Sequence, residues 1–310
     1  MRKIVLVVAL AGGLSACAVY HAEPLPEAPE LAAQPPHPAM DMDGVGTFAI
    51  AHSPDLMAER RRADVTIAQA YQGGLLPDPQ FSASADHPTI HGAGLVNGYA
   101  LGLAQDLQAL LIEPSRAAAA DAKRKQAQLD LLWAEWQTLQ KSANLYAQKI
   151  YADDKLAALQ RTAGVLQKQA QHSAHELKRH NTTIDMAGAD LSAALDITSQ
   201  QDAAARAAVA ADSDLKALLG LAPTASLTLI DPGDPPEISR KDVQDALKQV
   251  IHSRPDLLAL QAGYHAQDEA VWTAILQQFP AINVGFNRAS DTSNIQTNGL
   301  AVTINIPNLR

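Results

Sequence analysis

Few side chains in this 310-residue chain combine a residue type and a spacing that could do chemistry. His172 and His175 stand three residues apart, so on a helix they could share a metal ion, and His180 follows. The spacing to His180 does not suit the same helix face, so we interpret all three as solvated histidines and predict no metal site. The sequence also offers no glycine-rich phosphate loop, nucleophile elbow or isolated carboxylate pair. We therefore expect neither an enzyme nor a bound cofactor.

Composition narrows the class of partner. The chain carries a formal net charge of −9, and aromatic residues make up only 4% of it. No basic stripe exists that could displace counterions from a phosphate backbone, so we expect no nucleic-acid partner.

The amino terminus predicts export. A cationic start, an apolar run over residues 4–11 that is too short to span a bilayer, and the small-residue box 14–17 indicate a signal peptide over residues 1–17. The box resembles the bacterial lipoprotein signal, which implies that Cys17 is acylated, with palmitate among its lipids. Ala18 stands where an aspartate would favour the inner membrane, so the implied address is the outer membrane of a Gram-negative bacterium. The alternative is an ordinary signal peptide with an incidental cysteine.

An internal repeat organises the rest of the chain. Residues 54–56 (Pro-Asp-Leu) recur at 255–257 and Asn97-Gly98 recurs at Asn298-Gly299, each at an offset of 201 residues (255 − 54 and 298 − 97). Roughly fifty residues are repeated without an insertion, as in a duplicated structural unit. We divide the chain into a Pro-rich tether without a core (18–44) and one functional domain (45–310). The domain contains a complete first repeat (45–220), a connector (221–240) and a partial second repeat (241–310).

Each copy is predicted to contain one helix followed by two strands. The helices begin at Pro54 and Pro255, because proline suits the first turn of a helix. The strand regions alternate apolar and polar residues, which fits tilted transmembrane strands and, equally, a half-buried soluble sheet. Four strands cannot close a barrel, so a membrane barrel would need several chains. The positions expected to face lipid are Phe81, Ala83, Tyr99, Leu101, Leu103, Ile282, Val284, Phe286, Leu300, Val302 and Ile304.

A long helical hairpin is predicted after Pro114. The first helix should run from about residue 115 to 179 and the return helix to Leu219, with Gly220 ending it. Apolar residues at alternating steps of three and four predict a heptad seam, in which Trp133 and Trp136 contribute to packing rather than to a ligand platform. The seam comprises Leu129, Leu132, Trp136, Leu139, Ala143, Tyr146 and Ile150. The tip comprises His180, Asn181, Thr182, Thr183, Ile184 and Asp185.

The fold class is therefore mostly α with a small β part, a coiled-coil-like hairpin plus four membrane-type strands. Together these parts resemble the TolC-like family of outer-membrane efflux proteins. The likeness lies in the Pro-Asp-Leu helix start, the 75–79 helix-to-strand junction, the 97–103 strand and residues 218–221, which close the return helix.

The resemblance implies a homotrimer in which each chain gives four strands to an outer-membrane barrel. It also implies that the tube joins a periplasmic adaptor (membrane fusion) protein and an inner-membrane pump, and that the hairpin tip faces the adaptor. Such a tube is a passive exit duct for small molecules or metal ions. We expect the chain to be truncated before a second hairpin. The tip also departs from the family pattern because it contains no glycine. The alternative is a non-conducting periplasmic lipoprotein that acts as a scaffold or adaptor-binding rod.

Overall fold

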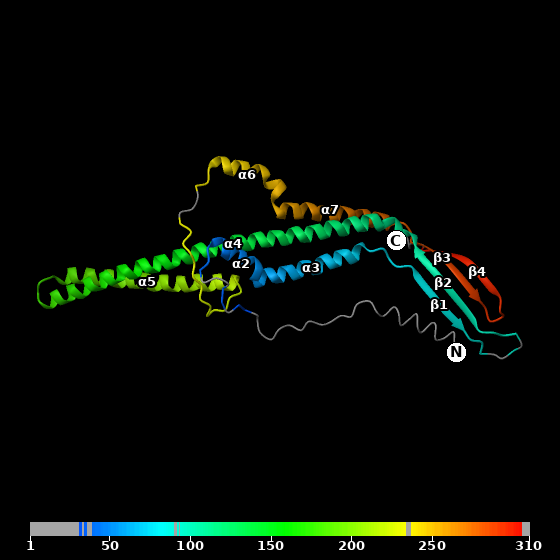
Figure 1. The fold of residues 1–310 in the computed structure, drawn as a ribbon, viewed down its shortest axis with the longest axis horizontal. Helices are drawn as coiled ribbons and strands as arrows, with labels where there is room; N and C mark the ends of the chain where they lie inside the picture. Colours follow the sequence, from blue (N-terminus) through cyan, green and yellow to red (C-terminus); the bar gives the residue numbers. More distant parts are fainter. Residues whose placement is uncertain are drawn as a thin grey trace.

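The long axis of the molecule is set by one helix. The computed structural model describes residues 31, 32, 34, 35, 39–89, 92, 94–233 and 237–305. In it, helix α4 (Leu107–Lys178) runs from a four-stranded sheet at one end of a rod to a helical turn at the other (Figure 1). Its 72 residues correspond to roughly 108 Å at 1.5 Å per residue. Cys17 and the signal peptide lie outside the described residues.

The predicted repeat is present as two copies of a helix and a strand pair. The first copy consists of α3 (Pro54–Gly74), β1 (Gln80–Asp86) and β2 (Gly98–Asp106). The second consists of α7 (Pro255–Leu276), β3 (Ile282–Ser290) and β4 (Gln296–Ile304). Both helices have proline in their first turn, as the sequence predicted.

One antiparallel sheet joins the two copies. Its strand order is β1-β2-β3-β4, so the central pairing of β2 with β3 connects the first copy to the second. In the register Leu103 pairs with Phe81 on one side and Phe286 on the other. The duplicated units therefore complete a single structural layer rather than two separate sheets.

The long helix begins earlier than predicted. The sequence suggested a start after Pro114, but α4 already begins at Leu107 and carries Pro114 inside it. Asp106 caps this earlier start, because its carboxylate accepts hydrogen bonds from the backbone N–H groups of Gln108 at 2.8 Å and Ala109 at 3.3 Å. The prediction was wrong here because a strong cap outweighs the backbone hydrogen bond that a proline removes.

The single heptad seam predicted along α4 was also wrong. Tyr146 is fully buried, but Leu132, Trp136 and Leu139 are exposed in the single chain. The reason is that α4 changes partners along its length. It packs against α3 and α7 near the sheet, against α2 (Met42–His52), and against α5 (Ile184–Leu218) toward the turn. One stripe of α4 cannot face all of these neighbours.

Small residues dominate the hairpin interface itself. Along α5 five alanines are buried, and Ala152, Ala163 and Ser173 are buried on α4. Close contact between helices is possible where side chains are this short. The five alanines of α5 are Ala187, Ala194, Ala204, Ala208 and Ala211.

The largest buried cluster lies where α2, the middle of α4 and the end of α5 meet. Its members are Met40, Val45, Phe48, Ala49, Tyr146, Leu215, Leu219, Leu221 and Ala225. The Tyr146 hydroxyl donates a hydrogen bond to the carbonyl oxygen of Ile230, and burial raises the pKa of that phenol. This core holds the connector against the long helix.

The end of the expected tether joins this core. Met40 is buried and exchanges backbone hydrogen bonds with Thr228 and Ile230, and Ala32 does so with Gly220 and Ala222. Helix α2, which the sequence analysis missed, starts at Met42 behind the cap Asp41. The structure thus differs from a tether that stays free of the core up to residue 44.

Helices α3 and α5 lie end to end beside the long helix. The carboxyl end of α5 meets the start of α3, and a Cβ added to Gly220 would lie 2.8 Å from the His52 carbonyl oxygen and 3.3 Å from Pro54 Cδ. Gly220 has a φ of +64°, and its contact with Pro54 leaves no room for a side chain. Helices α3 and α5 therefore follow one another along α4 (Figure 1).

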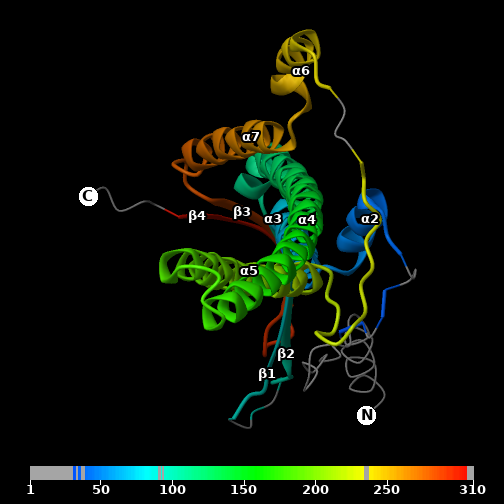
Figure 2. The same ribbon diagram turned by 90° about the vertical axis from the view of Figure 1, so that its left-hand side faces the viewer.

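Helix α6 (Arg240–Ser253) is the element with the fewest neighbours. It starts at a capping box formed by Ser239 and Asp242. Figure 2 shows it standing away from α4, whereas α2 lies against α4. Among the helices of the described ranges, none is both long and apolar enough to cross a bilayer.

Candidate functional site

The eleven strand positions predicted to face lipid lie on one face of the sheet. Residues directly opposite each other in neighbouring strands share a face, so the register can be followed across the sheet. One row runs Phe81, Leu103, Phe286, Leu300 through all four strands. Adjacent rows contain Ala83 with Leu101, Tyr99 with Ala85, Val284 with Val302, and Ile282 with Ile304.

This apolar face is open to solvent in the single chain. Leu300 is 80% exposed and Phe81 is 70% exposed, and Leu101, Leu103, Phe286, Val302 and Ile304 are also exposed. Among the described residues, no helix covers the central row of this face. The same face also carries Arg288 opposite Leu101 and Ser290 opposite Tyr99, so its apolar part centres on the row of Phe81, Leu103, Phe286 and Leu300. An exposed apolar surface of this kind indicates a missing partner, either lipid or protein.

The opposite face of the sheet carries polar and small residues. One row runs Ser82, Gly102, Asn287, Gly299, so small residues alternate with polar ones. A Cβ added to Gly102 would lie 2.6 Å from Ser82 Oγ, and one added to Gly299 would lie 2.6 Å from Asn287 Oδ1. A side chain at either glycine would require the neighbouring Ser82 or Asn287 side chain to move. The sheet is amphipathic as a whole.

The sheet also has two open edges. Strands β1 and β4 are outermost in the order, and within the part of the chain that the structure describes neither has a second strand beside it. An edge strand presents unpaired N–H and C=O groups, which cannot remain unpaired in a bilayer. Any membrane role of this sheet would require further strands at both edges.

At the other end of the rod, the predicted tip forms the turn between α4 and α5. His180 has a φ of +62°, and the Asn181 N–H donates to the Glu176 carbonyl at 2.9 Å, as in a helix end that glycine normally occupies. Thr183 caps α5 by accepting a hydrogen bond from the Met186 N–H at 3.3 Å. The predicted break between the two helices is confirmed.

The tip presents a small apolar surface. Ile184 and Met186 are exposed, and Asn181 donates a hydrogen bond to the Glu176 carboxylate at 2.7 Å. Asp185 lies in the first turn of α5, where a negative charge is favourable, and Thr182 donates to the Met186 sulfur. Of the six predicted tip residues, His180, Asn181, Thr182 and Thr183 form the turn, and Ile184 and Asp185 begin α5.

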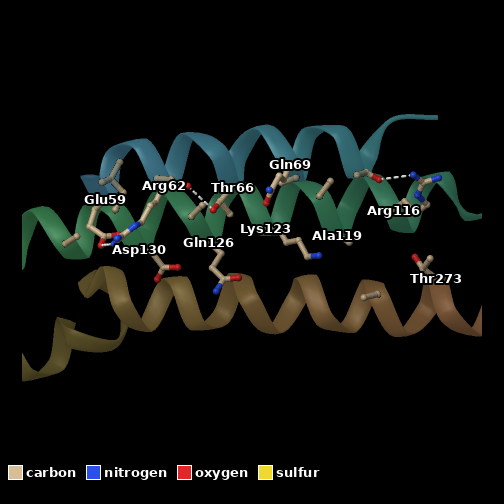
Figure 3. Close-up of a pocket in the computed structure, with 18 residues that line it drawn as sticks. Glu59, Arg62, Thr66, Gln69, Arg116, Ala119, Lys123, Gln126, Asp130 and Thr273 are labelled. Carbon is tan, nitrogen blue, oxygen red and sulfur yellow. Dashed lines mark hydrogen bonds and ion pairs between the residues drawn. The ribbon is translucent and has the colours of Figure 1, made fainter. Parts of the chain in front are cut away.

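A groove of about 640 Å³ lies near the sheet end, between α3 and α7 with α4 as its floor (Figure 3). Arg62, Thr66 and Gln69 reach it from α3, and Lys123 and Asp130 reach it from α4. Burial raises the pKa of the Asp130 carboxyl. The groove combines charged and polar side chains with a floor of small residues.

Sequence reasoning missed this groove, although a signal was present. Ala120, Ala127 and Ala134 recur every seven residues on α4, and Ala63 and Ala70 do so on α3. A seven-residue period keeps residues on nearly the same side of a helix. A row of alanines along one side of a helix predicts a shallow surface there, because the side chains are short.

The histidines of the tip region are not gathered with other ligands. Within the described ranges, no group of three His, Cys, Asp or Glu side chains is close enough to hold a metal ion. Ser173 and Gln169 donate hydrogen bonds to Asp190, so that carboxylate is engaged between the two hairpin helices.

Comparison with known proteins finds similar structures but no similar sequences. No family model matches the sequence, and no curated protein does. Among solved structures, CusC, studied for its folding and transmembrane channel formation, aligns with a TM-score of 0.65 at 15% identity over 95% of this chain and 73% of CusC. VceC, an outer membrane protein of Vibrio cholerae, aligns with a TM-score of 0.66 at 17% identity over 87% of this chain and 69% of VceC.

A third structure gives the same result. The CmeC outer membrane channel of Campylobacter jejuni aligns with a TM-score of 0.65 at 14% identity over 86% of this chain and 61% of CmeC. At sequence identities this low, the structural agreement shows a shared fold and nothing further. The chain has the fold of the TolC-like outer-membrane efflux channels that its sequence resembles.

Proposed function

We propose that this protein is an outer-membrane channel component of a tripartite efflux system, a passive exit duct for small molecules or metal ions. The observation that carries the proposal is the exposed apolar face of the sheet, with its central row of Phe81, Leu103, Phe286 and Leu300. An amphipathic sheet whose apolar side has no cover in its own chain suits a barrel wall, with lipid outside and water inside. The proposal assigns no catalytic activity and no cofactor to the chain.

Closure of such a barrel needs several copies of the chain. Each copy supplies four strands and two open edges, so β1 of one copy would pair with β4 of the next. Three copies give a twelve-stranded barrel, as the likeness to the TolC-like channels suggests. The homotrimer, the outer-membrane location and the contact of the eleven apolar side chains with lipid are all part of the proposal.

The hairpin would extend from the membrane toward the partners of the duct. Its tip exposes Ile184 and Met186, which could contact a periplasmic adaptor protein bound to an inner-membrane pump. Acylation of Cys17 would anchor the same chain to the outer membrane. Replacing Cys17 by serine should abolish lipid attachment, and labelled fatty acid still incorporated into that variant would refute the anchor.

Conductance across planar lipid bilayers tests the duct. Purified protein should insert and give discrete current steps. The variant Leu300→Arg places a charge on the apolar face and should reduce insertion strongly, because such a charge costs roughly 2–4 kcal/mol near the bilayer midplane. The matched control Thr303→Arg, on the other face of the same strand, should still insert.

A second candidate function is a non-conducting periplasmic scaffold that uses the hairpin as an adaptor-binding rod. The exposed Ile184 and Met186 favour it, because a docking tip does not require a pore. Protein that binds an adaptor but gives no current steps would support the scaffold and contradict the duct. Equal insertion of Leu300→Arg and Thr303→Arg would remove lipid contact from the proposal.

A further inference from the structure

A second groove, of about 560 Å³, lies on α4 where α2 ends and α7 begins. Its walls are Ile50, Leu132 and Leu139, and two indole rings, Trp133 and Trp136, lie on its floor. Its volume falls in the range of small-molecule sites, and its lining is mostly apolar. Nothing in the proposed duct function uses this groove.

The two indoles form an ordered stack. The ring centroids of Trp133 and Trp136 are 4.7 Å apart and the rings are nearly parallel, at 11°. The guanidinium carbon of Arg254 lies 5.1 Å from the centroid of Trp133. The chain thus already places one planar cation over this aromatic pair, by an attraction between the positive charge and the ring face. Trp136 is 47% exposed and available to a further planar group.

Ion pairs fix the positions of the groups around the stack. Arg254 donates hydrogen bonds to both oxygens of Asp256, at 3.0 and 2.7 Å. On the other wall, Glu135 and the carbonyl oxygen of Ile50 each accept a hydrogen bond from Arg60, both at 2.8 Å. A site whose side chains are held before binding loses less entropy when a ligand enters.

Charge decides the class of ligand. Arg254, which lines the groove, donates to both oxygens of Asp256, whereas Arg60, which does not line it, donates to Glu135 and to the Ile50 carbonyl oxygen. The Glu135 carboxylate lines the groove and is bonded to Arg60 through one oxygen, Oε1. Together with the net charge of −9, this favours a cation over an anion.

We propose that this groove binds planar aromatic cations, which stack on Trp136 as Arg254 does on Trp133. The ring supplies the stacking surface, Ile50 and Leu139 cover the apolar edges, and Glu135 faces the positive charge. The inference does not depend on the duct, because the groove lies on the helical rod rather than on the sheet.

Binding of proflavine, a planar aromatic cation, to the full-length protein in detergent tests this proposal through the fluorescence anisotropy of the dye. Trp136→Leu keeps an apolar side chain but removes the ring, and it should weaken binding by about tenfold. The matched control is Trp272→Leu on α7, which also alters an exposed tryptophan and should leave binding unchanged. Glu135→Gln should weaken proflavine more than it weakens an uncharged acridine.

Three outcomes would overturn the proposal. The first is no binding to the wild-type protein, and the second is an equal loss in Trp136→Leu and Trp272→Leu. The third is binding that appears only at dilutions where the protein dissociates, as size-exclusion chromatography would show. A second copy of the chain would then occupy the groove in the undiluted protein. Circular dichroism melts of each variant exclude loss of folding as the cause.

Discussion

Helices α2 and α6 stand at equivalent places in the two copies of the repeat, yet their surroundings are opposite. Each precedes a Pro-Asp-Leu helix. In α2 the side chain of Val45 is fully buried, whereas in α6 Leu247 is 63% exposed. The comparison teaches that both copies form a helix at this place, while the neighbouring helix determines whether it is buried.

One pair of equivalent residues gives the physical reason. At the repeat offset of 201 residues, Gly46 of α2 corresponds to Leu247 of α6. A Cβ added to Gly46 would lie 2.6 Å from Leu139 Cδ1, so α2 approaches α4 closely only because it has no side chain there. With leucine at the corresponding position, α6 has apolar side chains, Val243 and Leu247, that stay exposed among the described residues.

The largest expected effect lies in the repeated Pro-Asp-Leu helices. Leu56 is 1% exposed, and Leu257 is only partly buried. Leu56→Ala should lower the free energy of unfolding by about 2–5 kcal/mol, because it leaves a cavity, and Leu257→Ala should cost clearly less. Urea denaturation followed by circular dichroism measures both. Equal costs would mean that the second copy is buried in solution as deeply as the first.

Exchange of the residue types at the α2 and α6 positions tests close packing. Gly46→Leu should destabilise the protein by about 1–3 kcal/mol, because the new side chain must displace Leu139. Leu247→Gly should cost about 1 kcal/mol through helix propensity alone. The control Leu247→Ala, which keeps the propensity, should change stability by less than about 0.5 kcal/mol. A large cost for Leu247→Ala would show that α6 has a partner.

The two ends of the hairpin helices should respond with opposite signs. Gly220→Ala strains a positive φ and contacts the His52 carbonyl, so it should cost about 1–2 kcal/mol or more. His180→Gly relieves the same backbone conformation at the tip and should stabilise by about 1 kcal/mol. Thermal unfolding of the two variants measures both signs, and destabilisation by His180→Gly would indicate that the imidazole makes a contact of its own.

The smallest expected effect concerns the ion pair between Arg254 and Asp256 at the start of α7. A hydrogen bond from Arg254 lowers the pKa of the Asp256 carboxyl below its ordinary value of 3.8. A depressed folded pKa stabilises the protein above the unfolded pKa, and this stability is lost as the pH falls through the folded pKa. The melting temperature of wild type should therefore fall slightly more between about pH 5 and about pH 2.5 than that of Asp256→Asn.

Asp55→Asn provides the matched control in the first copy. Within the part of the chain that the structure describes, Asp55 forms no side-chain ion pair, so this change should leave the acid dependence of the melting temperature as in wild type. A loss of acid dependence in both variants would assign the effect to the helix dipole rather than to Arg254.

Local chemistry made the repeated elements predictable. Proline at the first turn marked both α3 and α7, and period-2 alternation marked the strands, because these signals depend on the residues of one segment alone. The amphipathic α2 was missed because its face contains glycine and alanine, which give little apolar signal. The start of α4 was missed because the cap Asp106 lies before a proline that usually bounds a helix.

The candidate site could likewise be predicted from the sequence only in part. The eleven apolar strand positions followed from alternation, but the register that aligns Phe81, Leu103, Phe286 and Leu300 in one row follows from pairing between distant segments. The groove in Figure 3 needs α3 and α7 to meet on α4, which no single segment encodes, whereas both rings of the indole stack come from α4 itself.

By itself, the sequence determined the duplicated helix-strand-strand units, the hairpin with its break near His180, and the amphipathic character of each strand. Tertiary structure alone decided which residues of α4 are buried, that α2 is covered while α6 is not, and that the two copies share one sheet. The reason is that propensity and periodicity act over a few residues, whereas burial depends on which distant helix or strand lies opposite.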